Sequence, residues 1–98
     1  MSELYRAEII SNQSVQEDIT ELLEQEIPSI QYTVIPEIHC RGGRTKKLGD
    51  TVWPEMNFLL FSDLEKEDAV KVKAVVEAVK QRFPNEGISV FFTKAEDL

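Results

Sequence analysis

The segment Glu55-Met56-Asn57-Phe58-Leu59-Leu60-Phe61 is apolar on both sides if it forms a strand. Successive side chains of a strand alternate between its two faces, and each face would here receive at least two large apolar residues. This pattern is typical of a strand in the interior of a sheet. We therefore expect a central strand, and we expect another subunit to cover the sheet face that no helix of the same chain covers.

A helix and a strand are expected directly after this segment. Ser62 and Glu65 have the spacing of a capping box, which favours a helix beginning at Ser62. The turn-forming residues 84–87 would end that helix, and residues 88–93 would form the last strand. The apolar residues that recur at helical spacing between these limits are Val72, Val75, Val76, Val79 and Phe83.

The first half of the chain is expected to have a similar order. Residues 4–10 alternate as a strand, and Ser14 and Glu17 again have capping-box spacing ahead of a helix that ends before Pro28. Residues 30–39 are rich in strand-forming residues. Pro36 within this run indicates an edge position or a bulge, because proline donates no backbone hydrogen bond.

The complete order is strand, helix, strand, loop, strand, helix, strand. Two split βαβ halves of this kind predict an α+β ferredoxin-like βαββαβ sandwich, in which a four-stranded antiparallel sheet carries two helices on one face. We expect one domain over residues 1–98, with a loop at residues 41–54 between the second and third strands.

Composition narrows the possible partners and compartments. The chain has 18 Asp and Glu against 11 Lys and Arg, a net charge of −7, which disfavours nucleic acid, including binding in the manner of an RNA-recognition motif. Neither a run of ~20 apolar residues for a membrane span nor a signal peptide is present. With one cysteine, no internal disulfide can form. We therefore expect a cytoplasmic protein without membrane insertion.

The loop is the most basic part of the chain. Arg41, Arg44, Lys46 and Lys47 supply four of the 11 cations, and Gly43 lies among them. Glycine-rich backbone beside Arg and Lys can bind phosphate or carboxylate groups. The alternative interpretation is that these residues only keep an exposed loop flexible and soluble. A phosphate-ester hydrolase using this loop is disfavoured, since we find no positioned acid, base or nucleophile, and we expect no enzyme activity.

A second possible site adjoins the loop. His39 and Cys40 precede it, and Glu37 would share a strand face with His39. Imidazole, thiolate and carboxylate are ligands for divalent metals, although another subunit would have to complete the coordination. The alternative is an ordinary strand histidine beside a small buried cysteine.

Two parts of the sequence resemble the PII (GlnB-like) nitrogen regulatory proteins. Residues 30–38 followed by Gly43-Arg44-Thr45-Lys46 are similar to that family's second strand and to the Gly-Arg-Gln-Lys start of its long signalling loop, with Thr45 in place of the glutamine. Residues 87–92 are similar to the loop and strand that close the family's nucleotide site. The resemblance covers nearly the whole chain.

The resemblance implies a homotrimeric, non-enzymatic sensor. It would bind a small anionic effector, such as a nucleotide, in clefts between subunits, and its loop would signal to a regulated partner protein. Arg44, Lys46 and Lys47 would neutralise the effector, Gly43 would offer backbone donors, and Gly87 would permit a close approach. The related CutA family, which shares the trimeric fold, implies the alternative of a trimer that binds a divalent metal through His39, Cys40 and Glu37.

Overall fold

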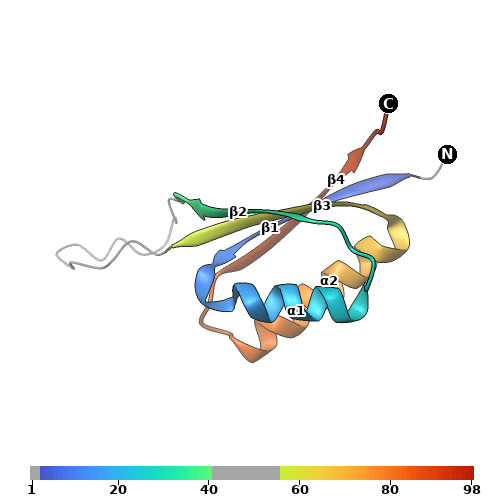
Figure 1. Cartoon of the computed structure of the whole chain (residues 1–98). Coiled ribbons are helices and arrows are strands. Elements are labelled where there is room, and N and C mark those ends of the chain that lie inside the picture. The colour runs from blue at the N-terminus through green and yellow to red at the C-terminus, as the bar shows by residue number, and fades with distance from the viewer. Residues whose placement is uncertain (1–2, 41–55) are drawn as a thin grey trace.

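The computed structural model describes residues 3–40 and 56–98, which form a sheet with two helices on one of its faces (Figure 1). This arrangement confirms the predicted ferredoxin-like α+β fold. A single 3₁₀ turn precedes the first helix. The elements are β1 (Leu4–Asn12), the 3₁₀ turn (Gln13–Val15), α1 (Gln16–Glu26), β2 (Thr33–Ile38), β3 (Asn57–Glu65), α2 (Lys66–Arg82) and β4 (Ile88–Ala95).

The four strands are antiparallel and lie in the order β2-β3-β1-β4. β3 pairs with β1 on one side and with β2 on the other, so the predicted interior position is confirmed. β2 lies at an edge, and its register with β3 shifts between Ile35 and Ile38. Pro36 and Glu37 together lie opposite one residue of β3, so the expectation from Pro36 is met by an edge position and an irregular register.

The core lies between the sheet and the helices. Alternate residues of β1 and β3 face the helices and are buried, as the period of two requires. The helices contribute apolar residues at helical spacing. The largest apolar side chains that are fully buried are Ile9, Val15, Ile19, Leu23, Phe58, Leu60, Val72, Val76 and Val79.

Both predicted capping boxes are wrong. The Asn12 side chain accepts a hydrogen bond of 2.9 Å from the Ser14 backbone N–H, so Asn12 caps the 3₁₀ turn, and α1 follows with Val15 at its cap position instead of Ser14. Ser62 lies in β3 rather than at a helix start, and α2 begins only at Lys66. β3 continues to Glu65 because Ser62 and Leu64 extend its row of buried residues.

Other strand limits also differ from the prediction. β1 continues to Asn12 and β4 to Ala95, whereas β2 begins at Thr33 instead of residue 30. The Ile30 N–H donates to the Ile27 carbonyl at 3.0 Å, which holds that residue in a turn after α1. The expected loop at residues 41–54 and the start of the expected strand at Glu55 lie outside the described residues.

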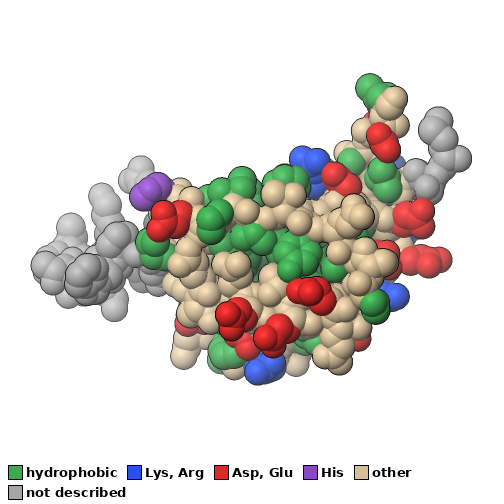
Figure 2. Space-filling model, in the orientation of Figure 1, with side chains coloured by type: hydrophobic (Ala, Val, Ile, Leu, Met, Phe, Trp, Pro, Cys, Tyr) green, Lys and Arg blue, Asp and Glu red, His purple; other side chains and the backbone are tan. Residues whose placement is uncertain are grey.

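The sheet face opposite the helices, the open face, carries apolar side chains. Strand pairing places Ile35, Leu59 and Ile10 in one row across it, and Phe61, Glu8 and Phe91 in the next. Phe91 is 59% exposed and Ile35 is 41% exposed. Figure 2 views the molecule from the side and shows hydrophobic side chains at the surface along the sheet, with a group of acidic side chains over the helices. In the described part of the chain, one face of the sheet is thus left without a helical cover.

Candidate functional site

The predicted effector site lies only partly in the described residues. Gly43, Arg44, Thr45, Lys46 and Lys47 lie outside them. The structure does describe Gly87 and the three residues of the alternative metal site. It also describes the two strand ends that flank the basic segment, where Ile38 of β2 pairs with Asn57 of β3. We refer to this end of the sheet as the loop end.

Gly87 lies at the loop end, but across the sheet from β2. Asn12 of β1 pairs with Asn57 of β3, and Ser11 pairs with Ile88, the residue that follows Gly87. The order β2-β3-β1-β4 puts three strand spacings between the outer strands, about 14 Å at the usual separation. The described residues of one chain therefore do not bring Gly87 to the end of β2.

The surroundings of Gly87 are open. A Cβ built on this residue would have no other atom within 4 Å. No steric contact within the described chain therefore requires glycine here. The space beside Gly87 leaves room for a group from outside the chain to approach the backbone closely.

Gln13 is the residue at the loop end that the sequence analysis missed. Its backbone N–H donates to the Met56 carbonyl at 2.8 Å, and its side-chain amide donates to the Pro36 carbonyl. Gln13 follows β1 directly, so it ties the end of β1 to β2 and to the residue before β3. The only signal in the sequence is a polar residue just after a strand.

The residues of the alternative metal site do not form a complete site. Glu37, His39 and Cys40 are exposed. β2 ends at Ile38, so His39 does not share a strand face with Glu37. The other interpretation is wrong for Cys40, because this cysteine is exposed and not buried. In residues 3–40 and 56–98, no group of three His, Cys, Asp or Glu could hold a metal ion.

The open face carries an ion pair beside its apolar residues. The Arg6 guanidinium donates two hydrogen bonds of 2.9 Å to the Asp63 carboxylate, and it lies 4.9 Å from the centre of the Phe61 ring. The hydrogen bond from Arg6 holds the pKa of Asp63 below its ordinary value, and the same bond raises the pKa of Arg6. Each charge of this pair is therefore balanced by the other, next to the apolar surface of the open face.

Neither helix in the described part of the chain is long and apolar enough to cross a membrane. No protein-family model matches this sequence, and no curated protein matches it either. Solved structures do match, over nearly the whole chain and at low sequence identity.

Three of these structures are informative. A protein from Thermus thermophilus, described as PII-like and signalling, has 16% identity and a TM-score of 0.66, with 96% of this chain and 88% of that chain covered. CPII is a nitrogen regulatory PII-like protein from Thiomonas intermedia K12, and its structure is bound to ADP, AMP and bicarbonate. It has 14% identity and a TM-score of 0.66, with 98% of this chain and 96% of that chain covered. A functionally unknown protein from Pediococcus pentosaceus ATCC 25745 has 10% identity and a TM-score of 0.69, with 100% and 97% covered.

The chain therefore has the fold of the PII-like signalling proteins, and the resemblance inferred from its sequence is confirmed at the level of fold. A fold of this kind hosts more than one function.

Proposed function

We propose that this protein is a non-enzymatic, homotrimeric PII-like regulator in the cytoplasm. It binds a small anionic effector, with a nucleotide as the first candidate, in clefts between subunits. The basic loop at residues 41–54 then signals to a partner protein. The observation that carries the proposal is the likeness of nearly the whole chain to CPII, a PII-like protein whose structure contains ADP, AMP and bicarbonate.

The open face supports self-association. Phe91 is 59% exposed on the same face of the sheet as Leu59, Phe61 and Ile10, with Glu8 between Phe91 and Phe61, and covering such apolar surface is favourable by roughly 25 cal/mol per Å². A second and third copy of the same chain provide matching surfaces, because a symmetric oligomer uses the same patch in every subunit.

The positions of Gly87 and β2 favour a site shared between subunits. They lie at opposite edges of one sheet, and a neighbouring copy can bring its own β4 edge next to β2. In this arrangement Arg44, Lys46 and Lys47 neutralise the effector, while the backbone at Gly43 and Thr45 donates hydrogen bonds. Gly87 of the neighbouring copy permits a close approach.

Native mass spectrometry tests assembly and effector binding together. The protein is measured alone and with ADP, AMP, ATP and bicarbonate, and we expect a trimer that gains one nucleotide per subunit. Arg44→Ala with Lys46→Ala should abolish nucleotide binding and leave the trimer intact. The control is Lys71→Ala with Lys80→Ala, which removes the same charge from exposed positions of α2. Unchanged affinity in the Arg44/Lys46 variant contradicts the site assignment, and a monomer contradicts the intersubunit cleft.

A second variant tests which surface forms the interface. Phe91→Glu places a charge on the open face at its most exposed aromatic residue, in the edge strand β4, and should convert the trimer to monomers, because an unpaired charge is costly to bury. Gln25→Glu adds the same charge at an exposed position of α1 and should leave the trimer unchanged. A Phe91→Glu trimer as stable as the native one would show that the open face is not the interface.

The metal-binding alternative is tested in the same experiment by adding divalent metal ions. If the trimer takes up metal but no nucleotide, and if His39→Ala removes the metal, the protein is a metal-binding trimer and the proposal above fails. The nucleotide-sensor proposal predicts that His39→Ala has little effect on effector binding.

A further inference from the structure

A pocket of about 210 Å³ lies on the helix side of the sheet, between α2 and the edge strand β4. It is at the end of the sheet opposite the loop end, because Tyr5, which lines it, pairs with Leu64 near the end of β3. Neither the effector site nor the alternative metal site uses it. Its lining residues are Tyr5, Lys66, Ala69, Val70, Lys73 and Phe92.

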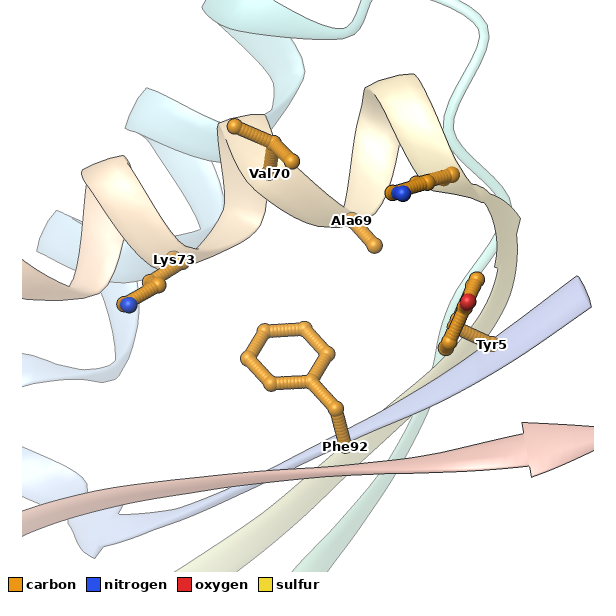
Figure 3. Close-up of a pocket in the computed structure, with 6 residues that line it drawn as sticks. Tyr5, Ala69, Val70, Lys73 and Phe92 are labelled. Carbon is orange, nitrogen blue, oxygen red and sulfur yellow. The ribbon is translucent and has the colours of Figure 1, made fainter.

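The lining is built by a stripe of α2 and by two aromatic rings from the sheet. Residues 66, 69, 70 and 73 are three, four and seven positions apart, so they share one face of the helix. Figure 3 shows the Phe92 ring between β4 and α2, with Ala69 pointing toward it and with Lys73 and Tyr5 on either side. The Tyr5 hydroxyl donates to the Glu3 carboxylate at 3.2 Å, and Glu3 does not line the pocket. Tyr5 therefore makes its hydrogen bond outside the pocket. The walls are therefore almost entirely carbon.

Two cations flank this apolar surface. Lys66 and Lys73 are exposed and lie two turns apart on α2. Among residues 3–40 and 56–98, neither ammonium forms an ion pair, whereas Lys71 pairs with Asp68 and Arg82 with Asp18. Val70 is 61% exposed at the rim. In a chain with a net charge of −7, unpaired lysines beside apolar surface favour an anionic ligand with an apolar body.

We propose that this pocket binds a small organic carboxylate with an aromatic or branched aliphatic body. The body packs against Phe92 and Ala69, and the carboxylate lies near Lys66 or Lys73. A closed cavity of about 150 Å³ accommodates benzene, and this pocket is larger but open to solvent on one side, so one ring with a short side chain fits against its wall. Apart from the two ammonium groups, its walls offer no hydrogen-bond partner to replace water around a bare anion such as phosphate, which is why the ligand needs the apolar body.

NMR titration with three matched probes tests this proposal. The probes are para-fluorophenylacetate, the uncharged para-fluorophenylacetamide, and acetate, which has no apolar body. We expect the first probe to shift amide signals of α2 near Ala69 and of β4 near Phe92, the second to bind about threefold more weakly, and acetate not to bind. Raising the salt concentration should weaken binding of the acid and leave that of the amide unchanged.

Paired variants separate the role of the two lysines from a general effect of charge. Lys66→Ala with Lys73→Ala should lower the affinity for para-fluorophenylacetate about threefold. Lys71→Ala with Lys80→Ala makes the same charge change on the same helix outside the pocket and should not lower it. Thermal unfolding of both variants shows that each one is folded.

Four results of the titrations with these probes would overturn the proposal. These are no binding of the acid, equal affinity for acid and amide, unchanged affinity in the Lys66/Lys73 variant, and probe shifts that map to the open face around Phe91. Pocket signals that move on dilution without a probe would assign the site to a second copy of the chain and would also overturn it. All these readouts are independent of nucleotide binding, so failure here and failure of the proposed function are distinguishable.

Discussion

The guanidinium of Arg6 binds both carboxylate oxygens of Asp63, with Nε–Oδ1 and Nη2–Oδ2 distances of 2.9 Å. The two residues face each other across β1 and β3, the interior strands of the sheet. Two parallel hydrogen bonds to one carboxylate fix the geometry more tightly than a single contact does. The pair therefore joins the two strands on the face that no helix covers.

This ion pair makes stability depend on pH. The hydrogen bond from Arg6 lowers the pKa of Asp63 from its ordinary 3.8, so the folded state holds the charged form more strongly than the unfolded state does. The stabilisation is present above the ordinary carboxyl pKa and is lost as the pH falls through the lowered one. Asp63→Asn should thus be less stable than the native protein at neutral pH, and the difference should shrink in acid.

Urea unfolding from neutral pH to about pH 2 measures this effect. Asp97→Asn, which removes the same charge from an exposed position after β4, is the control and should show no such trend. A difference between Asp63→Asn and the native protein that stays constant down to acid pH would mean that the ion pair does not stabilise the fold.

Gln13 should control how firmly β2 is held at the loop end. Gln13→Ala removes the side-chain hydrogen bond to the Pro36 carbonyl, while the backbone bond to Met56 can remain. We expect faster hydrogen exchange in β2 and little change in β4, because β2 is an edge strand with an irregular register. Gln25→Ala, at an exposed position of α1, is the matched control. Equal exchange rates in both variants would contradict an anchoring role for Gln13.

The sequence was sufficient to predict the strand and helix order because the buried positions follow simple periods. The apolar faces of residues 55–61 predicted the interior position of β3, and Pro36 predicted an edge position or a bulge for β2, which has an edge position and an irregular register. The Arg6–Asp63 pair was not predictable, because its partners are 57 residues apart and meet only once the strand register is fixed. The two hydrogen bonds from Gln13 were not predictable for the same reason, because they also join residues that are far apart in the sequence.

The capping boxes failed for a different reason. The spacing of Ser62 and Glu65 matches the motif, but Ser62 also continues the alternation of β3, and burial on the core face decided its conformation. Of the predicted effector site, only Gly87 lies in the described residues. Its place at the edge opposite β2 follows from the strand order, which local sequence patterns do not specify.

Ser62 should contribute to stability through its buried hydroxyl. The hydroxyl donates to the Gln31 carbonyl at 2.6 Å, and the residue is only 3% exposed. Ser62→Ala leaves that carbonyl without this donor and should lower the free energy of unfolding by about 1 to 2 kcal/mol. Ser11 is equally buried, but its hydroxyl makes only a 3.4 Å contact with the carbonyl of the next residue. Ser11→Ala should therefore cost much less in urea unfolding, and similar costs would contradict the assignment.

Asn12 and Ser14 give the sharpest test of how the first helix begins. The Asn12 side chain accepts the hydrogen bond from the Ser14 backbone N–H, so Asn12→Ala removes the cap of the 3₁₀ turn that leads into α1 and should lower the free energy of unfolding by about 1 kcal/mol. Ser14→Ala keeps the backbone donor and the acceptor and should have little effect. The urea concentration at the midpoint of unfolding measures the effect of each variant, provided that the slope of the unfolding free energy against urea concentration is unchanged. If Ser14→Ala proved the more costly variant, the serine would be the cap after all, and the helix would begin as its sequence motif indicates.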